Sequence, residues 1–549
     1  MTLETFDFST ISDAELTPLV RKLLSIIGQQ AALIEKQAAQ IQRQSEQIDA
    51  LKEEIAKLKG LKGRPKIAPS RLNDMKRNSP VPSDGKRPGS DKQSKKVSVI
   101  IDETIRVPPA KVPPGSRYLG TREFDVQDLL IKTHNIRYLL EEWQTPDGRY
   151  ISGEPPEDGR QGHFGANLVS FILYQHHQCH VTQPLLHEQL QEFGVDISAG
   201  QVNHFLTEDL DIFHDEKDQI LKAGLEVSSF VQVDDTGARH DGKNGYCTYI
   251  GNDLFAWYGS TGSKSRINFL ELLSAGKVSY RLSEGAFRYM VEEKLSKMVV
   301  KTLRRSTRRV FKSQADWLEY LRHLGIIRLG HVRLVTEAAL YGALLASGFN
   351  SELVILSDDA GQFNVPLLPH ALCWIHAERA IKRLVPMTDR QREEQAEIAD
   401  AFWQLYRALK DYKEKPQKRR RQQIERTFET LFQRRTSFES LNLALRRIYD
   451  NRAELLLVLD HPELPLHNNS AESDIREYVK RRKVSGGTRS DCGQRSRDTF
   501  TALKKTCRKL GLSFWRYLHD RLGKAGEIAY LPELIRDLSL GPVLARAAS

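Results

Sequence analysis

Two short apolar runs in this sequence each end in a pair of aspartates. The runs span residues 230–233 and 353–356, and the acidic pairs that follow them are Asp234 with Asp235 and Asp358 with Asp359. Short, branched apolar runs bounded by turn residues predict buried strands rather than helices. A carboxylate at the end of a buried strand is costly to keep charged without a partner, and a divalent metal ion is one such partner.

A third carboxylate stands at the expected start of a later helix. Glu472 lies in the stretch HNNSAESDIR, where Asn469 or Ser470 can cap the helix. Two further strand-like runs, residues 246–251 and 254–259, follow the first acidic pair. In a ribonuclease-H-like fold, one acid lies on the first of three successive strands, a second acid follows a later strand and a third acid lies on a helix. We therefore predict an α/β core, a mixed sheet with helices, that carries helical insertions.

Four motifs in the chain occur in the order found in one known family. They are VDDTG at 233–237, LSDDAGQF at 356–363, CWIHAER at 373–379 and NNSAESDIR at 468–476. Together they resemble the insertion sequence 66 family of bacterial transposases, which are Asp-Asp-Glu transposases. The later segments RKVSGGTRS and GLSFWRYL fit the same family, and the resemblance covers the chain from about Gly165 to Leu522.

The resemblance implies that Asp234, Asp358 and Glu472 are the catalytic residues and the metal ligands. Three carboxylates would hold two Mg²⁺ ions, with Mn²⁺ as a substitute, because hard divalent cations prefer oxygen ligands. The implied reaction is transposition, in which water cuts the 3′ ends of the element and the freed hydroxyl attacks target DNA. The acids alone would indicate only metal-dependent phosphodiester chemistry.

Each aspartate has an acidic neighbour, which leaves a choice of ligand. Successive side chains on a strand point to opposite faces, so Asp234 and Asp235 cannot both face one metal ion. The family's aspartates fall on Asp234 and Asp358, which favours them over Asp235 and Asp359. Aspartates that only form turns and hold no metal are the alternative interpretation.

The composition favours a polyanionic partner and gives no sign of a membrane protein. There are 82 Lys and Arg against 71 Asp and Glu, a formal net charge of +11, so DNA is the first expected partner. The five cysteines are scattered and form no CxxC pair, which argues against a disulfide scaffold and a cysteine zinc site. No apolar run approaches the roughly 20 residues of a membrane helix, and the first residues are too acidic for a signal peptide. We expect a bacterial cytoplasmic, nucleoid-associated protein.

Three segments are expected before the helical part of the chain. Residues 1–60 predict a coiled-coil helix, because isoleucines recur every seven residues from Ile27 to Ile55. Such a helix would form a homodimer or higher oligomer. A single amphipathic helix is the alternative. Residues 61–96 predict a basic disordered linker. Residues 97–160 predict a small β-rich module, the cysteine-free counterpart of a zinc-binding module in the family, so no zinc ligand is expected there.

Residues 161–222 predict a helical region with a helix-turn-helix-like unit that binds DNA. Expected helices at 185–193 and 201–210 flank a tight connection in which Ser198 is a plausible cap. Gln201, Asn203 and His204 occupy the start of the second helix, where side chains that read base edges usually lie. The alternative is a plain helical bundle.

The remaining segments complete the core and supply further basic residues. Residues 223–375 form its first part, with a basic helical insertion at 280–350; residues 376–460 form a second helical insertion, and residues 461–549 add the helix of Glu472 and the C-terminal helices. The DNA contacts expected in these segments are Arg304, Arg305, Arg308, Arg309, Arg476, Lys480, Arg481, Arg482, Lys483 and Arg489. His376 and Arg379 are second-rank candidates for the site, as is Arg476.

Two other function classes remain open at this point. A non-catalytic DNA-binding regulator would explain residues 1–220 without chemistry but would leave the acids unexplained. A related ribonuclease-H-like nuclease would cleave DNA without joining it. Accessory proteins of the same element are a further class of partner for a transposase.

Overall fold

The computed structural model describes residues 101–109, 111, 113–119, 121–155 and 162–547, together with the single positions 18, 30 and 37. The expected coiled coil, apart from those three positions, and the expected linker therefore lie outside the described residues. The chain divides into two units, Met1–Gln127 and Asp128–Ser549. Within 101–127 the described residues form neither helix nor strand.

The expected β-rich module contains one short hairpin among its described residues. β1 (Glu142–Gln144) pairs in antiparallel fashion with β2 (Tyr150–Ser152), and both strands are fully exposed. The described residues of the other strand-like runs in this module have no regular secondary structure.

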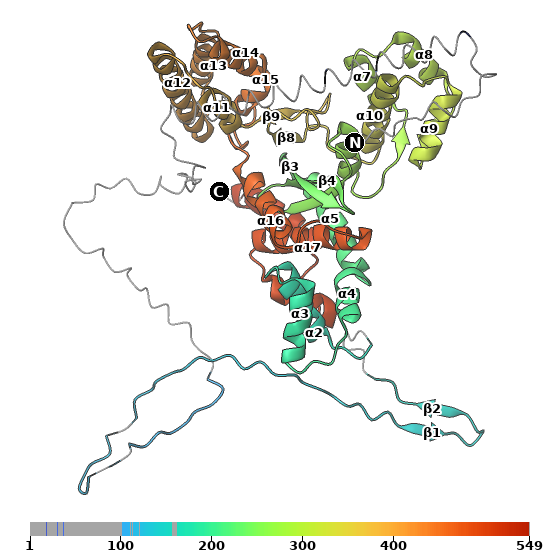
Figure 1. Ribbon diagram of the computed structural model, residues 1–549, viewed down its shortest axis with the longest axis vertical. Helices are drawn as coiled ribbons and strands as arrows, with labels where there is room; N and C mark the ends of the chain where they lie inside the picture. Colours follow the sequence, from blue (N-terminus) through green and yellow to red (C-terminus); the bar gives the residue numbers. More distant parts are fainter. Residues whose placement is uncertain are drawn as a thin grey trace. The chain divides into compact units, whose positions relative to one another are not determined.

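A mixed five-stranded sheet forms the centre of the second unit (Figure 1). Its order is β5–β4–β3–β8–β9, with β3 (Phe230–His240), β4 (Lys243–Gly251), β5 (Ala256–Thr261), β8 (Val354–Ser357) and β9 (His370–Leu372). β3, β4 and β5 are antiparallel neighbours, whereas β8 pairs in parallel with both β3 and β9. The predicted α/β core with a mixed sheet is confirmed at this level.

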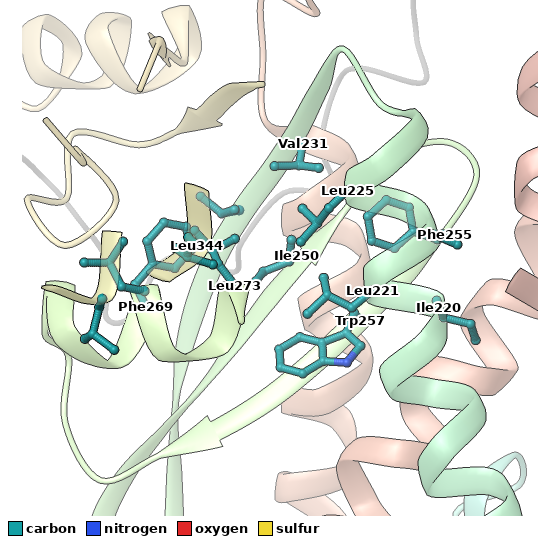
Figure 2. Close-up of a cluster of buried hydrophobic side chains, with 14 of the residues drawn as sticks. Ile220, Leu221, Leu225, Val231, Ile250, Phe255, Trp257, Phe269, Leu273 and Leu344 are labelled. Carbon is teal, nitrogen blue, oxygen red and sulfur yellow. The ribbon is translucent and has the colours of Figure 1, made fainter. Parts of the chain in front are cut away.

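One face of the sheet packs on a large apolar core. Val231, Ile250 and Trp257 from three neighbouring strands meet Leu221 and Leu225 of α5 (Asp211–Val227) in Figure 2. The same core includes α6 (Arg266–Leu273) and α10 (Leu329–Ala346). Alternate residues of each strand point to this face, as the two-residue repeat of a strand requires.

The opposite face of the sheet packs on two late helices. Tyr249 and Tyr258 of the sheet contact a cluster with Ile475 and Tyr478 of α16 (Asn469–Ser485) and Ala502 of α17 (Asp491–Lys509). Both faces of the sheet are covered, so charged side chains on its strands need polar partners within the protein. These partners define the candidate site.

The segments 280–350 and 376–460 are mainly helical. The first contains β6 (Tyr280–Arg281), α7 (Glu284–Glu292), α8 (Lys297–Arg305), β7 (Val310–Phe311) and α9 (Gln314–His323) before α10. The second contains α11 (Trp374–Lys382), α12 (Asp389–Glu414), α13 (Lys418–Phe432), α14 (Glu439–Asp450), α15 (Arg452–Leu455) and the 3₁₀ turn η3 (Leu457–Leu459). Val354 and Leu356 of β8 belong to the core of the second insertion, so that insertion is packed on the sheet itself.

Between residue 162 and β3 the chain is helical, and further helices follow α17. α2 (Ala166–His177), α3 (Gln183–Glu192), α4 (Ala199–Thr207) and α5 lead into β3, and α18 (Phe514–Gly523) and α19 (Leu531–Ala547) follow α17. α18 packs on α2, and α19 packs on α5. Among the described residues, no helix is both long and apolar enough to cross a membrane.

Candidate active site

The pairing of two strands brings the first two acidic segments together. Phe230, Val231 and Gln232 of β3 pair in parallel with Val354, Ile355 and Leu356 of β8. Asp234 and Asp358 follow these paired residues by two positions on each strand. β3 does not end at the acidic pair Asp234 and Asp235, as the sequence suggested, but continues to His240 along β4. Asp234 therefore lies in the middle of β3, where the parallel pairing stops, and Asp358 lies directly after β8.

Asp234 is a half-buried carboxylate among other acids. It accepts a hydrogen bond of 2.8 Å from the main-chain N–H of Asp235. Burial is the main reason why the pKa of Asp234 is raised to about 7, and the negative charges of Asp358, Asp235 and Glu472 raise it further. Such a group needs a cation nearby if it is to be charged at neutral pH.

Asp235 already has partners within the protein. Gln362 donates a hydrogen bond of 2.6 Å to one carboxylate oxygen, and Lys264 forms an ion pair with the other. Its side chain is only 6% exposed. The charge of Asp235 is thus compensated by the protein, in contrast to that of Asp234.

The two aspartates after β8 also differ in their surroundings. Asp359 binds Arg447 of α14, whose Nε lies 2.9 Å from the carboxylate. Asp358 has no such arginine; it accepts a hydrogen bond from the main-chain N–H of Ala360, and burial raises its pKa while His376 partly opposes the rise. Asp358 therefore remains the aspartate available beside Asp234.

Asn468 fixes the helix that carries Glu472. The expected caps, Asn469 and Ser470, lie inside α16, and the cap position is Asn468, whose side chain makes no capping bond. That side chain instead donates a hydrogen bond of 2.8 Å to the carbonyl of Val233, the residue before Asp234. The first turn of α16 is therefore attached to β3 beside the acids, and Glu472 lies in that turn.

Glu472 is bound by an arginine from the start of the second insertion. Arg379 of α11 donates two hydrogen bonds to its carboxylate, of 3.0 and 3.3 Å. His376 lies 3.8 Å from the same carboxylate and accepts a hydrogen bond from Arg379, and burial lowers its pKa. These two residues, second-rank candidates from the sequence, lie inside the site.

The donor atoms of this site suit a hard divalent cation. Asp234 and Asp358 are half-buried carboxylates with raised pKa values, and Mg²⁺ binds carboxylate oxygens in preference to nitrogen or sulfur. Within the described ranges, no three acidic, histidine or cysteine side chains already form a metal-binding group. Glu472 is bound to Arg379 instead, so a complete carboxylate cage requires Glu472 to leave that arginine.

Two short helices lie in the segment that was expected to form a helix-turn-helix-like unit. α3 and α4 flank the tight connection, and Ser198 accepts a hydrogen bond of 3.1 Å from the N–H of Gln201, which confirms the expected cap. Asn203 is exposed, and Gln201 and His204 are half-buried. Contact of these three residues with DNA stays a prediction.

Three of the four arginines expected to contact DNA on the basic insertion have hydrogen-bond or ion-pair partners in the protein. Arg304 binds Glu284 at 2.8 and 3.0 Å, and Arg308 pairs with Asp316. Arg309 donates to the main-chain carbonyl of Arg304, and Arg305 is exposed. Their proximity to DNA is untested by these contacts.

The basic stretch at the end of α16 is divided between surface and interior. Arg476, Lys480, Lys483 and Arg489 are exposed. Arg481 is only 5% exposed and binds the carbonyl and ring of His176, so it is a packing residue and the expectation that it contacts DNA is wrong. Arg482 is half-buried and donates to the carbonyl of Gly237.

The glycine turn after α16 packs on the protein rather than on open surface. A Cβ on Gly487 would lie 2.5 Å from the carbonyl oxygen of Arg239. Thr488 also exchanges main-chain hydrogen bonds with Arg239 and Asp241. The need for glycine here is explained by this close approach to β3, without a phosphate.

Comparison with known proteins gives the family. The family model described as "Transposase IS66 family" matches residues 345–496, which hold Asp358, Arg379 and Glu472. A protein of Sinorhizobium fredii, the uncharacterized protein y4jO, is 43% identical over 319 residues, which cover 58% of this chain and 99% of that protein. This chain belongs to the IS66 transposase family. The predicted resemblance is thereby confirmed. In this transposase, the segment matched by the family model includes β8, the second insertion and α16.

Several residues of the transposase site were not identified from the sequence. Asn468 and Gln362 lie inside the motifs named above, but no role was predicted for them. Their closeness in sequence to the acidic residues was the signal that could have identified them. Lys264 and Arg447 lie in segments with no motif. Arg447 is 88 positions from Asp359, so only the fold joins them.

Proposed function

We propose that this IS66-family transposase cuts phosphodiester bonds at the 3′ ends of its element and joins the freed hydroxyl to target DNA. Asp234, Asp358 and Glu472 are the proposed catalytic residues and the ligands of two Mg²⁺ ions, which Mn²⁺ can replace. The observation that carries the proposal is the convergence of β3, the end of β8 and the first turn of α16, held by the Asn468–Val233 hydrogen bond. The strand order supports a ribonuclease-H-like assignment of the core.

The chain's own residues supply most of the arrangement. Bound divalent ions would stabilise charge on the phosphorus oxygens and lower the pKa of the attacking water or hydroxyl. Asp234 and Asp358 provide uncompensated carboxylates, because Asp235 and Asp359 are already paired. Arg379 neutralises Glu472 in the free protein and becomes available to a phosphate when Glu472 is released.

DNA is held, in this proposal, along exposed basic residues outside the acid cluster. Those on and after α16 are Arg476, Lys480, Lys483 and Arg489, and Arg305 lies on the basic insertion. The helix-turn-helix-like unit would read the element ends through Gln201, Asn203 and His204. A homodimer or higher oligomer, accessory proteins of the element and a nucleoid location complete the proposal.

A cleavage and strand-transfer assay in Mg²⁺, on DNA carrying the element's ends, tests the site. Asp358→Asn keeps the size and removes the charge, so we expect cleavage and joining to disappear while DNA binding is retained. Asp359→Asn, which only removes the partner of Arg447, is the matched control and should retain most activity. Equal activity of the Asp358 variant and the unaltered protein would refute the assignment. Cleavage without joining would indicate the nuclease alternative.

A further inference from the structure

A cavity of about 310 Å³ opens beside Asp358, between α11 and α14. It shares Asp358 with the acid cluster, but most of its lining comes from the second insertion. Its volume is near the lower end of the roughly 300–1,000 Å³ typical of small-ligand sites. A cavity of this size fits one nucleotide unit and excludes a base-paired duplex.

The cavity combines cationic and small apolar side chains. Arg379, Arg383 and Arg447 line it, and Arg383 lies exposed. Ala444 and Ile448 of α14 line the same cavity, and the small side chain of Ala444 leaves part of the space open. Guanidinium groups bind phosphate through paired hydrogen bonds, and apolar side chains suit a sugar or base.

The charges of these arginines are unequally compensated. Arg447 is held by Asp359, and Arg379 is held by Glu472. No carboxylate in the described part of the chain is paired with Arg383. Arg383 is therefore the cation best placed to meet an incoming anion without first breaking an ion pair.

We propose that this cavity binds one unpaired nucleotide of the DNA strand that is cut at Asp358. The phosphate of that nucleotide would contact Arg383 and Arg447, and its sugar or base would lie against Ala444 and Ile448. This inference rests on the proposed function, since Asp358 lines both the cavity and the acid cluster. It adds a requirement for local strand separation at the element end.

The test is binding of a fluorescently labelled single-stranded oligonucleotide to the full chain in EDTA, followed by anisotropy. Arg383→Ala should weaken binding by roughly tenfold, the scale of one charge-assisted contact. Ala444→Leu should weaken it as well, because it fills the cavity and leaves every charge in place. The matched control is Arg446→Ala, an exposed neighbour on α14 that does not line the cavity and should change binding by less than about twofold.

Three results would overturn the cavity proposal. Equal effects of Arg383→Ala and Arg446→Ala on single-strand affinity would show that general surface charge is responsible. The same conclusion would follow if Arg383→Ala lowered the affinity for a blunt duplex of the same sequence as much as it lowered the affinity for the single strand. Tight single-strand binding by a folded Ala444→Leu variant would show that the cavity is not occupied. Failure here with cleavage still lost in Asp358→Asn would leave the proposed function intact. Support here with cleavage retained in Asp358→Asn would keep nucleotide binding by the cavity and would refute the cut at Asp358.

Discussion

Replacing Asn468 with alanine tests how the position of Glu472 affects activity, because the Glu472 side chain itself is unchanged. Asn468 is 1% exposed, and its amide donates one hydrogen bond, of 2.8 Å, to the buried carbonyl of Val233. Its other side-chain atom, Oδ1, has no hydrogen-bond partner in the described structure, and the side chain makes no capping bond. Truncation therefore removes one bond and leaves one buried carbonyl unpaired, which destabilises the fold by about 1–3 kcal/mol.

The expected loss of activity is larger than this loss of stability. Without the bond, the first turn of α16 is free to move away from β3, and a displacement of about 1 Å at a reacting centre costs on the order of 10²-fold in rate. We expect single-turnover cleavage by the Asn468→Ala variant to fall by that factor, at temperatures where the variant is fully folded.

Asn252→Ala is the matched control for this prediction. The Asn252 amide is also buried and donates to Ser228 and to the carbonyl of Phe230, at the other end of the same strand. Its removal should lower the urea midpoint of unfolding at least as much while leaving cleavage nearly unchanged. If both variants lose stability and cleavage to the same extent, Asn468 has no specific role in placing Glu472.

Three further predictions address packing, charge and pH. Burial lowers the pKa of His214 to about 4, so between about pH 4 and 6.5 the unfolded chain binds a proton that the folded chain does not. The contribution of His214 to the free energy of unfolding should be constant above about pH 6.5 and should be lost as the pH drops toward 4, so His214→Gln should lose less stability over this range than the unaltered protein in urea titrations. Gly487→Ala should destabilise the fold by about 1–3 kcal/mol because its Cβ would overlap a main-chain carbonyl of β3, whereas Gly361→Ala, with open space around it, should have a small effect in the same titration. Lys483→Ala should reduce the slope of log affinity against log salt for DNA by about one, while Arg481→Ala should lower stability and leave that slope unchanged.

The elements of this fold were predictable where the signal is local. The apolar run before Asp358 became β8, and the connection around Ser198 became a capped helix start, because each depends on neighbouring residues. The contact that distinguishes Asp359 from Asp358 is with Arg447, which reaches Asp359 only through the packing of α14. No local pattern encodes that contact.

Arg481 shows a signal that was present but not used. It stands in a run of cations and was therefore expected on the surface. It also shares the buried face of α16 with Ala471, Ile475 and Tyr478 at helical spacing. The periodicity of the whole helix indicates that Arg481 is buried, whereas the charge of the run does not. Arg379 is different, because its pairing with Glu472 spans 93 positions and required the fold.

The attachment of α16 to β3 also sets the order in which the protein acquires its site during synthesis. Asn468 and Val233 are separated by 235 positions, so a chain emerging from the ribosome can pair β3, β4 and β5 long before α16 exists. Contacts of such separation form late, since they close a long loop. The three acids thus come together only after nearly the whole chain has been made. A product truncated before residue 468 therefore has no assembled acid cluster, and it also lacks α17 and α18, which pack on α4 and α2.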